Sequence, residues 1–239
     1  MEKKARAEFL RTPETVCQPD PRSRFFGIPH DDGPYGGKAF EEHHRAISAF
    51  TLHSGVPEDI LIQFETAKNI YLYAWFVYRF YPVAKSHAYA CLELALRERL
   101  EPEMVEAGWE KREHGFGLRN YLKFAAKKGY IRNEDFEVWR QGVLIRARDR
   151  HFFESVEEME RLGLTEMEVD ESKIEIKEED KESDYVGILL ESIPYQRNHY
   201  AHGSKSLHKT VLGTFRIVSE IINSLWRIKE GAQGVQEQY

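Results

Sequence analysis

Cysteine is scarce in this sequence, and long apolar runs are missing from it. The 239 residues include only two cysteines, Cys17 and Cys91, too few for a disulfide framework, so a reducing cytoplasm is the expected compartment. The longest apolar run, at residues 70–78, is far shorter than the ~20 residues of a membrane-spanning helix. The basic start at residues 1–6 is not followed by an apolar segment, which argues against a secretory signal. We therefore expect a cytoplasmic protein with no membrane partner.

An excess of positive charge is also absent. The formal net charge is −6, so the chain as a whole is not a polycation of the kind that coats nucleic acid. The negative charge is concentrated at residues 154–184, which leaves the remainder mildly basic. No cysteine or second paired histidine lies at ligand spacing from His43, His44 or His53, so we expect neither a metal site nor another cofactor.

Helical periodicity covers most of the chain. Residues 1–37 are rich in proline and glycine without any period, which predicts an irregular, extended N-terminal arm. Residues 38–228 place apolar side chains at three- and four-residue steps, and this pattern predicts a single all-α domain. Residues 229–239 are expected to be a polar tail.

Breaks in this periodicity set the expected helix boundaries. Pro57 suits the first turn of a helix, and Pro82 should break or kink that helix. The helix between them is apolar on nearly every side, so we expect it to be central or covered by a partner. Gly129 should end a later helix, and Asn133 should cap the next one. The expected helices cover residues 38–52, 57–81, 83–100 (before a loop with Pro102 and Gly108), 118–128, 133–150, 184–193 (before a kink or restart at Pro194) and 207–228.

The acidic segment is expected to leave the core as an insertion at about residues 163–184. Two short alternating pieces, residues 167–169 and 174–176, could pair as a small hairpin. A disordered insertion is equally consistent with the density of like charge.

Residues 195–203 concentrate an arginine, an asparagine and two histidines. Arg197 could hold a scissile phosphate, because a guanidinium matches phosphate geometry and keeps its charge. His202 could move a proton near neutral pH, and Asn198, four residues before it on the same helix face, could orient either group. On a regular helix Arg197 and His202 lie about 140° apart. Their convergence therefore requires that the long arginine side chain reaches around the helix, or that the helix is irregular between Pro194 and Gly203.

Simpler explanations exist for each of these candidates. The arginine and histidine could form a solvated helix end with an incidental ion pair, and His199, a candidate helper in binding, could simply be exposed. Glu93 and Arg97, four residues apart, are expected to form a helix-stabilising ion pair. A basic stripe at four-residue steps comprises Arg119, Lys123 and Lys127. Such a stripe is usually a solvated helix face, but it is also a candidate track for an RNA backbone.

Three segments together resemble the HEPN superfamily. Arg197-Asn198 followed by Ala201-His202-Gly203 resembles its Arg-x(4–6)-His signature, including the polar residue after the arginine. Residues 92–97 resemble the early core helix of the family, and residues 117–131 resemble the segment that commonly follows it. The resemblance covers about residues 58–228. It implies an antiparallel helical bundle of HEPN type, usually a homodimer whose two motifs face one another.

The same resemblance implies a function. Active members are metal-independent endoribonucleases, often toxins or antiphage effectors, so the resemblance assigns Arg197, Asn198 and His202 to catalysis. It also implies RNA as the substrate and a cognate antitoxin or regulatory protein as a partner. The alternative is a non-catalytic helical module that binds a protein or a nucleotide. Ser204 stands where one subgroup has a tyrosine that a partner nucleotidyltransferase adenylylates, so that control is not expected here.

Overall fold

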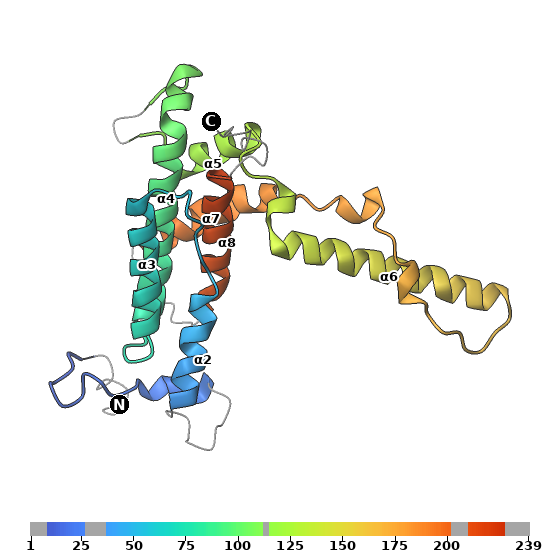
Figure 1. Ribbon diagram of the computed structural model, residues 1–239, viewed down its shortest axis with the longest axis horizontal. Coiled ribbons are helices and arrows are strands. Elements are labelled where there is room, and N and C mark those ends of the chain that lie inside the picture. Colours follow the sequence, from blue (N-terminus) through green and yellow to red (C-terminus); the bar gives the residue numbers. More distant parts are fainter. Residues whose placement is uncertain (1–8, 27–36, 112–114, 202–209, 228–239) are drawn as a thin grey trace, which may run out of the picture.

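The all-α prediction is confirmed by the architecture (Figure 1). A computed structural model describes residues 9–26, 37–111, 115–201 and 210–227. Within these ranges the chain forms seven α-helices and no β-strand, and none of these helices is long and apolar enough to cross a membrane. The helices are α2 (Gly37–Ser48), α3 (Glu58–Tyr73), α4 (Phe80–Glu106), α5 (Leu118–Lys127), α6 (Glu137–Arg161), α7 (Tyr185–Ala201) and α8 (Leu212–Leu225).

Helix α4 is the central helix of the bundle, because it packs against α3, α5, α7 and α8. Ala84, Ala88 and Ala95 are buried along it, and such small side chains let neighbouring helices approach closely. Leu92 and Leu96 are also buried and fill the space between those helices. Burial of α4 on several sides places its polar residues next to other helices, which matters for the site below.

The helix expected at residues 57–81 ends at Tyr73, and it is not the central helix of the bundle. Helix α3 buries one stripe, at residues 60, 64, 67 and 71, whereas Ile62 on another face is 54% exposed. A turn at residues 74–79 separates α3 from α4. Pro82 lies in the first turn of α4, where its missing N–H would have had no intrahelical partner, so it does not break the helix.

Two further boundaries differ from the expectation. Pro102 lies inside α4, which continues to Glu106 before Gly108 adopts a φ of 75°. Asn133 does not cap the helix that follows it. Its Oδ1 atom instead accepts a hydrogen bond from the backbone N–H of Val186 at 2.8 Å, so it caps the start of α7. Both errors arise because local preferences were assigned without knowing the long-range contacts.

The N-terminal segment is anchored to the bundle. A 3₁₀ helix, η1 (Pro21–Phe26), follows Asp20, whose backbone N–H donates to the carbonyl of Trp75 at 3.0 Å. Burial of Asp20 raises its pKa, but hydrogen bonds from Arg22 and from the backbone N–H groups of Arg22 and Tyr78 outweigh this and hold the pKa below its usual value. The described part of the arm therefore packs on the turn between α3 and α4.

The acidic insertion lies along α6, which points away from the bundle (Figure 1). Helix α6 continues to Arg161, well past the expected end at Arg150. Neither residues 167–169 nor residues 174–176 form a strand, and two 3₁₀ helices, η3 (Glu171–Lys173) and η4 (Glu178–Lys181), occupy this region instead. Asp180 is buried and accepts hydrogen bonds from Arg150 at 2.9 and 3.3 Å, which ties η4 to α6.

Candidate functional site

The expected site lies where the C-terminal half of α7 meets α4 and α5. Three residues of α4 at four-residue spacing, Lys85, Tyr89 and Glu93, contact this half of α7. The Tyr89 hydroxyl donates to Oε1 of Gln196 at 3.0 Å. The Lys85 ammonium lies 4.8 Å from the ring centroid of Tyr200. These contacts fix α7 against the central helix.

Arg197 is held by an acidic and an amide side chain. Its Nε and Nη2 atoms donate to Oε2 of Glu93 at 3.1 and 2.8 Å, and its Nη1 atom donates to Oδ1 of Asn198 at 3.3 Å. A guanidinium has five N–H groups, so these three contacts leave one N–H on each terminal nitrogen for an anion. The ion pair anticipated as a simple explanation therefore exists, but it joins two helices and orients the arginine.

The Glu93 carboxylate thus has a different partner from the expected one. Arg97 was predicted to pair with it along α4, whereas the structure pairs it with Arg197, 104 positions away in the sequence. A carboxylate that orients the arginine was therefore missed from the candidate site. The four-residue spacing of residues 85, 89 and 93 shows that they share a helix face, but nothing in the sequence shows that this face meets α7.

Arg197 and Asn198 open onto a cavity of about 500 Å³. Arg119 and Asn120 of α5 also line it, so the structure brings one member of the basic stripe to the arginine and asparagine of the motif. No side chain caps the N-terminus of α5, which begins after Gly117 in a left-handed conformation (φ 78°). The first N–H groups of α5 therefore add positive potential near this cavity.

Carboxylates offset much of the positive charge around this cavity. Arg119 donates to Glu191 of α7 at 2.7 Å, as Arg197 donates to Glu93. Lys85 forms no ion pair among the described residues, and its burial lowers its pKa. The residue is only 7% exposed. A buried ammonium beside Tyr200 is a second feature near the motif that the sequence pattern did not reveal.

The remaining candidates are placed differently. Lys123 and Lys127 are exposed on α5 as expected of a solvated stripe, and neither lines the cavity. The ring of His199 stacks with that of Tyr195 at 6.5 Å, on an exposed part of α7. His202 lies outside the described residues, so its convergence with Arg197 stays a prediction. Among the described residues, no three histidine, cysteine, aspartate or glutamate side chains cluster as metal ligands.

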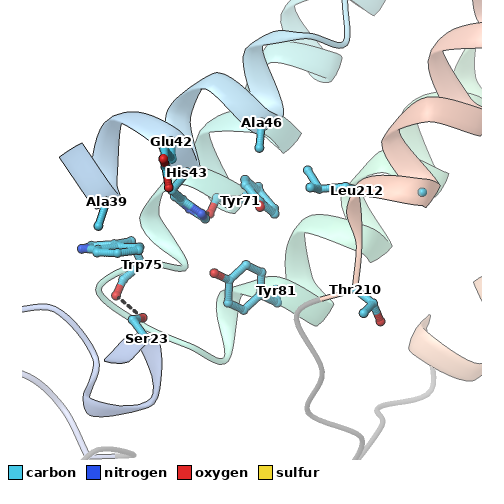
Figure 2. Close-up of a pocket in the computed structure, with 11 residues that line it drawn as sticks. Ser23, Ala39, Glu42, His43, Ala46, Tyr71, Trp75, Tyr81, Thr210 and Leu212 are labelled. Atoms are coloured by element: carbon cyan, nitrogen blue, oxygen red, sulfur yellow. Dashed lines mark hydrogen bonds between the residues drawn. The ribbon is translucent and has the colours of Figure 1, made fainter. Parts of the chain in front are cut away.

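A second cavity, of about 540 Å³, lies between α2, the end of α3 and the start of α8 (Figure 2). The described residues that line it are mainly aromatic and aliphatic, with Glu42 as the acidic one and no lysine or arginine among them. The rings of His43 and Tyr71 stack at 4.5 Å, and Nε2 of His43 donates to the Tyr71 carbonyl at 3.1 Å. Tyr71 and Tyr81 are buried, and their hydroxyls have no hydrogen-bond partner among the described residues. Burial raises the pKa of both phenols, so both remain donors.

Comparisons with known proteins give no relative for this chain. No family model matches it, and neither the curated proteins nor the solved structures contain a significant match. The described residues therefore define the class of protein only as an all-α helical bundle with a polar arginine site and a separate aromatic cavity.

Proposed function

We propose that this protein is a metal-independent endoribonuclease of HEPN type that acts as a toxin or antiphage effector. The observation that carries the proposal is the environment of Arg197. Glu93 and Asn198 orient its guanidinium at a polar cavity to which Arg119 and the uncapped end of α5 also contribute. Arg197, Arg119 and the first N–H groups of α5 can each interact with a phosphate of RNA.

The proposed reaction is a transesterification. The ribose 2′-hydroxyl loses its proton and its oxygen attacks the adjacent phosphorus, while the bond from phosphorus to the 5′-oxygen breaks and that oxygen takes up a proton. The products are a 2′,3′-cyclic phosphate and a 5′-hydroxyl. Arg197 binds the phosphate and offsets the charge that develops on it. His202 carries one of the two proton transfers, and the motif of a second copy in a homodimer would supply the other.

Glu93 and Asn198 have supporting roles in this proposal. Glu93 is a positioning residue, because its two contacts with Arg197 fix the plane of the guanidinium. Its negative charge also lowers the net attraction for phosphate, so binding depends on additional cations. Arg119, which lines the same cavity, is one of them. Asn198 completes the support on the other side of the arginine.

The proposal is tested by incubating the purified full-length protein with single-stranded RNA in EDTA. We expect cleavage to fragments that end in a 2′,3′-cyclic phosphate, and we expect the Arg197→Ala variant to leave the RNA intact. Arg45→Ala, which removes an exposed arginine of α2, is the matched control and should cleave like the wild type. If the wild-type protein left the RNA intact, either as a dimer or as a monomer, the nuclease proposal would be wrong.

A non-catalytic module that binds a protein or a nucleotide is the second candidate, and the aromatic cavity favours a binding role. Tyr71 and Tyr81 line the cavity, and their hydroxyls can donate hydrogen bonds to a ligand there. Among the described residues that line the cavity Glu42 is acidic and none is a lysine or arginine, so we expect an uncharged ligand, such as a nucleoside, and not a phosphate ester.

Adenosine and adenosine monophosphate are a matched pair for testing this cavity by calorimetry. We expect the protein to bind adenosine and to bind the charged monophosphate much more weakly. Tyr71→Phe and Tyr81→Phe each remove one hydrogen bond, worth about 0.5–1.5 kcal/mol, so each should weaken adenosine binding by about 2- to 12-fold. Equal binding of both ligands, or adenosine affinity unchanged in both variants, would exclude this use of the cavity.

A further inference from the structure

Tyr195 stands at the rim of the cavity onto which Arg197 and Asn198 open. Its side chain lines that cavity and is 74% exposed. The ring of His199, one turn further along α7, lies 6.5 Å from it and is nearly parallel to it, at 13°. Because so much of Tyr195 is exposed, this side chain contributes little to the packing of the bundle, and its ring is open to a ligand.

Tyr195 and Arg197 flank the cavity from two sides of α7. Successive residues of an α-helix are about 100° apart. Pro194 and Asn198 are therefore about 40° apart in the middle of the lining, and Tyr195 and Arg197 are about 160° apart at its two sides. A ligand that fills this cavity could contact an aromatic ring on one side and a guanidinium on the other.

The two arginines of the cavity are accessible to an anion. The side chain of Arg197 is 38% exposed, and that of Arg119 is 51% exposed. The partner of Arg119, Glu191, is itself 64% exposed. An ion pair so open to water contributes little to stability, so a phosphate can compete with Glu191 for Arg119.

Two amide side chains add neutral polar groups to the same lining. Asn120 donates from Nδ2 to the carbonyl of Phe116 at 2.9 Å, and its Oδ1 atom has no hydrogen-bond partner among the described residues. Asn198 accepts at Oδ1 from Arg197, and its Nδ2 atom has no partner within the described ranges either. The cavity thus combines cationic, neutral polar and aromatic groups, which match the phosphate, the ribose and the base of a nucleotide.

We infer that Tyr195 stacks on a base of single-stranded RNA and that Arg197 binds the phosphate next to that base. The inference rests on the proposed function for the class of ligand and adds the group that selects single strands. In a duplex both faces of each base are covered by neighbouring bases, so only an unstacked base can reach the Tyr195 ring. Every base has a flat aromatic face, so this contact does not require a particular base.

The test measures binding without cleavage. The probe is a labelled single strand of RNA with a 2′-O-methyl group on every ribose, so the attacking hydroxyl is absent, and fluorescence anisotropy reports its affinity for the full-length protein. We expect Tyr195→Ala to raise the dissociation constant about 5- to 140-fold, which corresponds to the loss of one base–aromatic stack. Tyr195→Phe keeps the ring and should bind like the wild type. Tyr73→Ala is the matched control, because Tyr73 is 57% exposed on α3 and does not line the cavity.

Two further probes separate stacking from charge. Inorganic polyphosphate carries phosphates without bases, so calorimetry should show equal binding to Tyr195→Ala and to the wild type, and weaker binding to Arg197→Ala. A 2′-O-methyl duplex of the same sequence should bind the wild type more weakly than the single strand does, and Tyr195→Ala should not change its affinity. The inference is wrong if the wild type does not bind the single strand, if Tyr195→Ala binds it as tightly as the wild type, or if this variant weakens polyphosphate or duplex binding equally.

These outcomes are distinct from failure of the nuclease proposal, which is decided by cleavage of unmodified RNA. If Tyr195 were required for binding single strands but unmodified RNA stayed intact, the stacking site would stand and the nuclease proposal would be wrong. If unmodified RNA were cleaved but Tyr195→Ala bound and cleaved it like the wild type, the nuclease proposal would stand and the stacking site would be wrong.

Discussion

Replacing His202 with alanine is expected to reduce the rate of RNA cleavage by roughly 10²- to 10⁴-fold, the usual contribution of a side chain that transfers a proton in the transition state. An imidazole suits this role because its ordinary pKa lies close to neutral pH. The loss should appear in kcat, because the phosphate would still be bound by Arg197 and by the groups at the start of α5. The measurement is a single-turnover time course on a labelled single-stranded RNA, with enzyme in excess.

His199→Ala is the control for this prediction. His199 is the other histidine of residues 195–203, and its ring stacks on that of Tyr195 on an exposed part of α7. Its replacement should therefore slow cleavage far less than replacement of His202. Equal losses for the two variants would mean that the helix end is needed only for structure or for binding RNA. Cleavage by His202→Ala at the wild-type rate would remove this histidine from the mechanism.

A variant of the acidic partner of Arg197 separates positioning from binding. Glu93→Gln keeps the size of the side chain but replaces the charged acceptor that holds Arg197 at 2.8 Å. We expect cleavage to fall because the guanidinium is less well oriented, while the affinity for RNA stays the same or rises because a negative charge is lost. Rates at saturating RNA and filter-binding affinities distinguish these two effects. A fall in affinity with an unchanged maximal rate would contradict a positioning role for Glu93.

The parts of the fold that depend on local sequence could be predicted well. Helix α5 was expected at residues 118–128 with a stop at Gly129, and it covers Leu118–Lys127 with Gly129 at a φ of 72°. A glycine tolerates this conformation at little cost, so its position alone marks the end of a helix. The amphipathic pattern of α8 likewise predicted its buried face, although α8 begins at Leu212, several residues after the expected start.

The parts that depend on distant contacts could not be predicted. The apolar pattern predicted that Trp75 and Tyr78 continue a helix. In the structure they are buried in the turn between α3 and α4, where the N-terminal segment packs on them. Arg197 finds its acidic partner 104 residues away, so sequence spacing favoured the nearer pair within α4. Which helix faces become neighbours is decided by the packing of the whole bundle, and a single sequence does not reveal this.

The largest stability effect is expected for Phe64→Ala. Phe64 is completely buried in α3, and its ring meets that of Phe215 in α8 at 5.9 Å in an edge-to-face contact. Deleting the ring leaves a cavity where α3 and α8 meet, because the surrounding helices can close only part of the space. Losses for such substitutions are about 3–5 kcal/mol. The prediction is checked by urea unfolding followed by circular dichroism, from the midpoint and slope of the transition.

Ile62→Ala provides the reference for this measurement. Ile62 lies two residues away on the same helix but is 54% exposed, so its replacement should change the free energy of unfolding by less than about 0.5 kcal/mol. The difference between the two variants isolates the contribution of the contact between α3 and α8 from any effect on helix propensity. If Phe64→Ala cost less than about 1.5 kcal/mol, the contact between Phe64 of α3 and Phe215 of α8 would be loosely packed.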